Sequence, residues 1–199
     1  MFFQFYKEIQ PVLDKERLLY LGENQAQEKQ MRQSNNRRYL IWEYLVSFRK
    51  CQYWRRVREN RKSSWLQRHL AKYLQRHYDR ERNLLSERCH VEIGIDSHIG
   101  AGVNIWHGGI VINGNLGEDC IIHGNTIIGN KGIGREDEYP TLGNRVDVGV
   151  GANIIGKVFV ADDCVIGAGA LVLKDFTTAK SIIVGNPARL LATSVKLNK

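Results

Sequence analysis

One histidine stands out among the residues that could do chemistry, because of its neighbours. His107 follows Trp106 and precedes Gly108 and Gly109, and two glycines leave room for a substrate beside an imidazole ring. An imidazole side chain is suited to general acid or base chemistry near physiological pH. The alternative is that His107 is only a polar residue at a corner of the fold.

The remaining histidines and the cysteines indicate no second reactive site. Cysteines at positions 51, 89, 120 and 164 form no CxxC pair, and histidines at 69, 77, 90, 98 and 123 show no metal-ligand spacing. There is also no Walker loop and no GxGxxG sequence. We therefore expect reduced thiols, no bound metal and no nucleotide-driven reaction.

The elements that position His107 differ in composition along the chain. Residues 1–88 hold 20 of the 29 Lys and Arg, 10 of the 21 Asp and Glu, and 14 of the 18 aromatic residues, whereas 18 of the 19 glycines lie beyond residue 88. We therefore expect a basic helical N-terminal region at 1–88 and a different, glycine-rich domain at 89–199. No run of eighteen apolar residues and no signal-peptide order is present, so we expect a cytoplasmic protein.

Helical periodicity predicts helices over about 4–20, 38–60 and 64–85, with a polar linker or solvated turn at 23–36. Ser64 and Gln67 fit a capping box, and an apolar stripe at helical spacing follows it, made of Leu66, Leu70, Tyr73 and Leu74. Three interpretations of the dense cations remain open: a solvated face, contact with an anionic membrane surface or acidic substrate, and nucleic acid. No nucleic-acid motif accompanies them, so we expect no nucleic-acid partner.

Glycine-rich residues 142–173 repeat with a period of six. Six leading aliphatic residues lie six positions apart: Leu142, Val148, Ile154, Val160, Ile166 and Val172. A small or β-branched residue follows four places after each of the first five. Neither an α-helix nor an ordinary strand has this period, which is typical of a parallel β-helix. By this pattern Cys120 and Cys164 are small core residues.

Two irregularities interrupt the period upstream. The step from Ile105 to Ile110 is five, so we expect one residue to be missing just after His107, and Gly129–Thr141 is an excursion from the coil. A regular coil needs neither irregularity, and departures from a regular repeat are often found at functional sites.

The segments 104–113, 122–132 and 184–189, with the hexads between them, resemble the hexapeptide-repeat acyltransferases with a left-handed β-helix. The resemblance covers residues 91–191 and lies within the serine-acetyltransferase-like branch, closest to the acetyltransferases of capsule and colanic-acid biosynthesis. It implies a mainly β fold with an α-helical N-terminus: a left-handed parallel β-helix of hexapeptide repeats, preceded by a helical arm. It also implies an acetyl-CoA-dependent O-acetyltransferase that works as a homotrimer, with the association of two trimers left open.

The resemblance places His107 at the family's catalytic histidine, which implies a general base that takes the proton of the acceptor hydroxyl as it attacks the thioester. Glu92 falls where serine acetyltransferases have an aspartate that orients this histidine, and its spacing of fifteen residues is close to one turn of the coil. Asp96 is the alternative carboxylate. The glutamate in place of aspartate is a departure from the family.

For acetyl-CoA, the resemblance implies contacts along one edge of the coil and cations near the phosphates. The expected residues are Gly129, Lys131, Ala152, Ala170, Lys174 and Arg189. Each alanine is equally explained as ordinary core.

The acceptor is expected to be a carbohydrate hydroxyl on a sugar or surface polysaccharide, with serine as the alternative. Serine acetyltransferases have an aspartate before the catalytic histidine and an arginine-histidine pair before the proline that re-enters the coil. Here Trp106 and the pair Glu138-Tyr139 take these places. Trp106 and Tyr139 would stack on a sugar ring and Glu138 would accept hydroxyl hydrogen bonds.

A non-enzymatic alternative is a β-helical scaffold whose basic arm binds an acidic partner. In the enzymatic interpretation the basic helices could also hold the protein peripherally at the inner face of the membrane.

Overall fold

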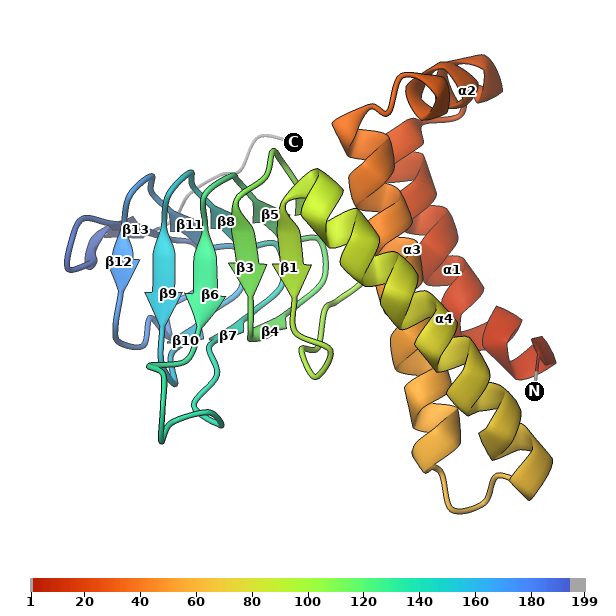
Figure 1. Cartoon of the computed structure of the whole chain (residues 1–199). Coiled ribbons are helices and arrows are strands. Elements are labelled where there is room, and N and C mark those ends of the chain that lie inside the picture. The colour runs from red at the N-terminus through yellow and green to blue at the C-terminus, as the bar shows by residue number, and fades with distance from the viewer. Residues whose placement is uncertain (1, 194–199) are drawn as a thin grey trace. The chain divides into compact units, whose positions relative to one another are not determined.

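The computed structural model describes residues 2–193, and its contacts divide the chain into two compact units, Met1–His90 and Val91–Lys199 (Figure 1). The first unit is helical and the second is a left-handed parallel β-helix. The predicted fold class is therefore confirmed.

The described part of the first unit, from residue 2, has four helices: α1 (Phe2–Leu21), α2 (Gln25–Gln33), α3 (Arg37–Glu59) and α4 (Trp65–Cys89). Helices α3 and α4 form an antiparallel hairpin, and α1 packs against α3. The core along α3 includes Tyr44, Leu45 and Phe48, which are fully buried. The predicted capping box starts α4, since the Ser64 hydroxyl accepts from the Gln67 amide and the Gln67 side chain accepts from the Ser64 amide.

The predicted linker at 23–36 is wrong, because α2 occupies most of it. Asn24 caps this helix by accepting hydrogen bonds from the amides of Ala26 and Gln27. No residue of α2 is buried, so the helix has no apolar stripe that periodicity could detect. An ion pair between Arg17 and Glu28 connects it to α1.

A buried ion pair joins α1 to α3. Glu16 is fully buried, and its Oε1 lies 2.5 Å from Nη2 of Arg49, which is also buried. Two buried charges are costly unless they stay close together, so this pair favours one docking position of α1 on α3.

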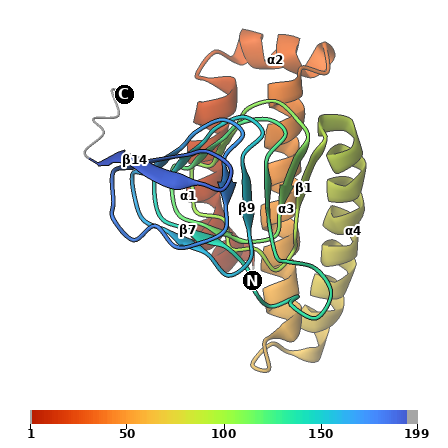
Figure 2. The ribbon, with the colours of Figure 1, turned by 90° about the vertical axis from the view of Figure 1, so that its left-hand side faces the viewer.

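Short strands make the second unit, in three sheets that the chain visits in turn (Figure 2). The first sheet has the order β1-β3-β6-β9-β12, the second β10-β7-β4 and the third β14-β13-β11-β8-β5-β2. All pairs are parallel except β13 with β14. The strand bounds are β1 (Val91–Ile93), β2 (Asn104–Ile105), β3 (Ile110–Ile112), β4 (Asn115–Leu116), β5 (Ile121–Ile122), β6 (Ile127–Gly129), β7 (Thr141–Leu142), β8 (Asp147–Val148), β9 (Asn153–Ile155), β10 (Phe159–Val160), β11 (Val165–Ile166), β12 (Leu171–Val172), β13 (Ser181–Val184) and β14 (Arg189–Thr193).

Aliphatic side chains stack in the coil interior, one row for each sheet. In the regular part, Ile154 pairs with Val172 and Val148 with Ile166, each eighteen residues apart, which is one turn of three hexads. These four side chains are completely buried. The six-residue period thus reports burial of one residue for each strand.

The excursion at 129–141 does not disturb this stacking. Ile128 of β6 pairs with Ile154 of β9 at a separation of twenty-six residues, eight more than a regular turn. Because the pairing stays in register, all the extra residues lie in the loop.

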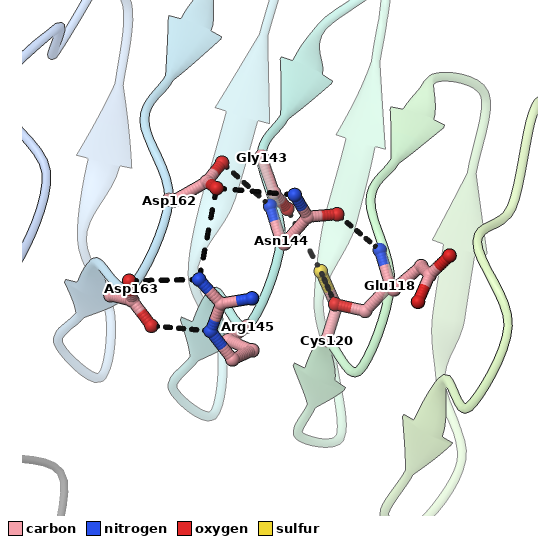
Figure 3. A network of polar contacts seen from close by, with 7 residues as sticks. All are labelled: Glu118, Cys120, Gly143, Asn144, Arg145, Asp162 and Asp163. Carbon is pink, nitrogen blue, oxygen red and sulfur yellow. Dashed lines mark hydrogen bonds and ion pairs between the residues drawn. The ribbon is translucent and has the colours of Figure 1, made fainter.

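A ladder of polar side chains links successive turns where the chain passes from the second sheet to the third (Figure 3). The Asn144 side chain donates to Asp162 over 3.1 Å and accepts from the Glu118 amide over 2.8 Å. Beside it, Arg145 forms a two-pronged contact with Asp163, at 2.6 and 3.0 Å. Here the coil is held by side chains as well as by the strand ladder.

Candidate active site

His107 lies in the turn between β2 of the third sheet and β3 of the first. It has a positive φ of 69° and an exposed side chain. Only a few per cent of non-glycine residues adopt this conformation, which costs on the order of 1 kcal/mol or more in a bulky residue. The regular turns at this corner have one left-handed residue, such as Asn125 and Gly151, whereas this turn has two, His107 and Gly109.

The irregularity at His107 is an insertion, so the predicted loss of one residue there is wrong. Ile112, and not Ile110, takes the next place in the interior row, because it pairs with both Ile93 and Ile128. It lies seven positions after Ile105, one more than a hexad. The shortening comes later, since Leu116 follows Ile112 by only four positions. The extra residue lets the chain bulge outward at His107.

Gly124 supports the bulge from the next turn of the coil. A methyl group at position 124 would lie 3.0 Å from Cβ of His107 and 3.1 Å from the carbonyl oxygen of Gly108. Both distances are tighter than ordinary contacts, so glycine is required for His107 to lie this close to the coil.

A second imidazole lies beside the first on the same edge. Nε2 of His123 is 3.2 Å from Oδ1 of Asp147, and the Trp106 ring stacks on the His123 ring with centroids 6.3 Å apart. The sequence indicates His123 only as a residue that lines the cleft near Gly124 and Asn125, and it gives Asp147 no role. The available signal was the spacing of seventeen residues from Trp106 to His123, which equals the pairing offset of β2 and β5.

Glu92 points outward from the middle of β1, opposite Val111 of β3. No hydrogen bond or ion pair joins it to His107 within the described chain. Asp96 lies in the turn after β1, at the other end of the first sheet from His107. The role of Glu92 stays a prediction.

Ala152 and Ala170 are core residues, which corrects their assignment to acetyl-CoA binding. Both are fully buried. The Ala152 amide donates to Gly149 and its carbonyl accepts from Ile127, while the Ala170 amide donates to Gly167 and its carbonyl accepts from Asn153. Neither the side chain nor the main chain of these alanines is left to contact a ligand.

The other expected cofactor residues lie on two different edges of the coil. Gly129 ends β6 and Lys131 follows it, with its side chain packed over Gly156 of the next turn. Lys174 follows β12 at this same edge, and its Nζ lies 5.7 Å from the centre of the Phe176 ring. Arg189, exposed at the start of β14 and paired with Val184, lies instead at the edge that carries His107.

The three residues expected to bind the acceptor are likewise not brought together within one chain. Trp106 lies beside His107, before β3. Glu138 and Tyr139 lie in the excursion after β6, at the opposite end of the first sheet. Tyr139 lines a pocket of about 70 Å³ there with Asp96 and Asn113, and Glu138 forms an ion pair with Arg135 at 3.4 Å.

The cysteines of the coil have the packing role expected of them. Cys120 and Cys164 are fully buried, and burial raises the pKa of the Cys120 thiol to about 11. The thiol donates to the carbonyl of Gly143 over 3.2 Å. Within residues 2–193, no group of three or more His, Cys, Asp or Glu side chains could hold a metal ion.

Comparison with known proteins shows which acyltransferases the chain resembles. No family model matches it. The serine acetyltransferase of Helicobacter pylori is 40% identical over 114 residues, which are 54% of this chain and 66% of that protein. That of Synechococcus elongatus is 35% identical over 118 residues, which are 56% of this chain and 48% of that protein. The chain thus spans about half to two thirds of the length of these relatives.

Solved structures show the same fold. The serine acetyltransferase of Vibrio cholerae superposes with a TM-score of 0.69 at 23% identity, covering 98% of this chain and 69% of that one. That of Brucella abortus gives 0.68 at 21% identity, covering 96% and 72%. These matches extend over the helical unit as well as the coil.

The expected place beside the capsule and colanic-acid acetyltransferases, with a carbohydrate acceptor, is wrong. The relatives and the solved structures are consistently serine acetyltransferases. The misleading signals were Trp106 and Tyr139, aromatic rings that could stack on a sugar. In fold, and over about half of its sequence, the chain is therefore similar to the hexapeptide-repeat acyltransferases of serine acetyltransferase type.

Proposed function

We propose that this protein transfers an acetyl group from acetyl-CoA to the hydroxyl of L-serine. The observation that carries the proposal is the 40% identity to a serine acetyltransferase over 114 residues. One structural neighbour is a serine acetyltransferase in complex with coenzyme A, which supports acetyl-CoA as co-substrate.

His107 is the general base of the proposed reaction. Its imidazole takes the proton of the serine hydroxyl while the oxygen attacks the thioester carbonyl. The tetrahedral intermediate collapses, the carbon–sulfur bond breaks, and the proton passes from the imidazolium to the sulfur of the departing coenzyme A. General-base assistance of this kind contributes about 10²- to 10⁴-fold to the rate.

The edge that carries His107 gives acetyl-CoA a path along the coil. From β2 to β13 this edge crosses four strand spacings, roughly 19 Å, with His107 at one end and Arg189 at the other. Acetyl-CoA lying along it would place its thioester at His107 and a phosphate at Arg189. Lys131, Lys174 and Gly129 lie on the other edge and could contact this molecule only from a neighbouring chain.

The acceptor needs a partner for its ammonium and another for its carboxylate. Glu138 and Arg135 supply one charge of each sign, three residues apart on the excursion. Because the excursion and His107 lie at opposite ends of the first sheet, one chain cannot offer both to the same serine. We infer a homotrimer whose sites combine His107 of one chain with the excursion of the next.

Release of coenzyme A, followed with a thiol reagent, tests the proposal directly. With acetyl-CoA and L-serine, the wild-type protein should release coenzyme A and form O-acetylserine, and His107→Ala should lower kcat by about 10²- to 10⁴-fold. His77→Ala is the control, because His77 is also an exposed histidine but lies on α4 in the helical unit.

A folded wild-type protein that transfers no acetyl group to L-serine would refute the proposed acceptor. Sedimentation then tests the assembly, since an active monomer would contradict the shared site.

A further inference from the structure

Three of the four residues of the apolar stripe predicted at the start of α4 lie exposed, whereas the fourth, Leu74, is packed against the protein. The sequence places Leu66, Leu70 and Tyr73 on one helical face, yet Leu66 and Tyr73 are each 71% exposed and Leu70 is 37% exposed. Trp65, beside them, is 69% exposed. The core of this hairpin instead uses the neighbouring face of α4, where Ala71 and Leu74 pack against α1 and α3. We call the exposed residues Trp65, Leu66, Leu70 and Tyr73 the α4 stripe.

The surroundings of the α4 stripe are strongly basic. Residues 52–78 contain eight Lys and Arg but a single carboxylate, Glu59. Glu59 is already paired with Arg55 at 3.1 Å and Arg58 at 2.9 Å, so it offers little charge to a partner. Four exposed cations flank the stripe: Arg61, Lys62, Lys72 and Arg76.

The tip of the hairpin between α3 and α4 (Figure 1) is closed by hydrogen bonds of its own side chains. Besides the capping box, the Arg68 guanidinium donates to the carbonyls of Ser63 and Arg61 and closes the loop between α3 and α4. The Trp65 ring contacts the His69 ring, with centroids 4.3 Å apart. The exposure of the stripe is therefore a property of a formed helix rather than of a frayed end.

We propose that this tip binds the surface of an anionic lipid bilayer. Tryptophan and tyrosine favour the interface between headgroups and acyl chains, where Leu66 and Leu70 would bury apolar area. The surrounding cations complement the negative headgroups, and each cation near such a surface strengthens binding about fivefold. A second copy of the hairpin fits less well, because it would bring two such basic tips together. No helix within residues 2–193 is long and apolar enough to cross a bilayer, so the contact is peripheral.

Flotation with vesicles tests the proposal on the full chain. Wild-type protein should float with vesicles of phosphatidylcholine containing about a third phosphatidylserine at low salt, but not with pure phosphatidylcholine. Binding should weaken in 1 M salt, where charges are screened within about 3 Å. Replacing the four flanking cations by glutamine should weaken partitioning on the order of several hundredfold.

The control for charge is the set Lys15→Gln, Lys29→Gln, Arg32→Gln and Arg37→Gln. It removes the same charge from exposed positions elsewhere in the helical unit and should retain most of the binding.

The contribution of the apolar side chains to vesicle binding is tested with one double variant in the α4 stripe and one control double variant elsewhere. Leu66→Ser with Tyr73→Ser should weaken binding at least about tenfold. Leu84→Ser with Leu18→Ser should not, although these leucines are 64% and 52% exposed. All variants should keep the helical circular dichroism and, because the tip is remote in sequence from His107, the coenzyme A release of the wild type.

Three results would overturn the proposal. The first is wild-type protein that stays unbound with anionic vesicles at low salt. The second is an equal loss of binding in the target and control sets. The third is concentration-dependent self-association that Leu66→Ser with Tyr73→Ser abolishes, which would show that a second copy covers the stripe.

Discussion

A single methyl group at position 124 should displace His107 without unfolding the coil. Gly124 has no positive φ, so alanine suits its backbone, and the effect of Gly124→Ala comes from contact alone. The new Cβ would lie 3.0 Å from Cβ of His107 and 3.1 Å from the carbonyl oxygen of Gly108. Relief of both contacts moves the His107 turn away from the coil.

The size of the effect follows from these distances. Ordinary contacts begin near 3.4 Å, so the turn must move by a few tenths of an ångström. A misplacement of about 1 Å at a reacting group costs about 100-fold in rate. A shift of about half that size should lower kcat roughly tenfold, with little change in KM for acetyl-CoA.

The control is Gly167→Ala, two turns further along the same edge. Its Cβ would lie 2.9 Å from Cγ1 of Val184, a contact at least as close but far from His107. Steady-state kinetics and urea unfolding of both variants separate positioning from stability. Equal losses of kcat in the two variants, or full activity in Gly124→Ala, would refute the positioning of His107 by Gly124.

Three further predictions concern stability and thiol chemistry. Glu16→Gln or Arg49→Met alone should lower the free energy of unfolding by about 3–5 kcal/mol, because each breaks the buried ion pair from one side, whereas Glu16→Leu with Arg49→Met should cost far less. Urea unfolding followed at 222 nm measures this, and additive single losses in the double variant would contradict it. Asn144→Ala, which removes side-chain bonds between successive turns of the coil, should lower stability by about 1–3 kcal/mol; an unchanged melting temperature would show that the ladder is dispensable. Burial raises the pKa of the Cys51 and Cys120 thiols to about 11 from 9.0, so the folded state holds these protons more tightly and its stability should fall as pH rises from about 9 to 11. Cys120→Ala should flatten that slope, and rapid reaction of the native thiols with Ellman's reagent at pH 8 would contradict their burial.

The coil could be predicted because its period has one physical cause. In the regular part of the coil each short strand buries one aliphatic side chain, so Val148, Ile154 and Val160 repeat every six residues in the sequence. The capping box at Ser64 was equally visible, since a hydroxyl and an amide three residues apart satisfy each other's main-chain groups.

The register at His107 could not be predicted because local patterning is ambiguous there. Ile110 and Ile112 are two apart, point to the same side of β3 and are both buried. Either could head the hexad, and only the pairing of Ile112 with Ile93 and Ile128 decides between them. Whether a residue is lost or gained beside His107 depends on contacts a turn away.

Two other predictions were wrong for a shared reason. Periodicity in a sequence indicates which residues share a face of an element, but not which part of the protein packs on that face. The stripe at Leu66, Leu70 and Tyr73 has the spacing of a packing face and lies exposed. Ala152 and Ala170 have the size expected beside a ligand and lie inside the coil. In both cases the partner is supplied by the tertiary structure.

The excursion between β6 and β7 shows where this architecture tolerates change. Eight additional residues enter between Ile128 and Leu142, yet β6 still pairs with β9 in the register of a regular turn. Corners of the coil can therefore lengthen over evolution while strands cannot, since one residue added to a strand would turn its aliphatic side chain outward. The same property makes this loop the place to graft a new recognition segment, because its sequence can be exchanged without altering the stack beneath it.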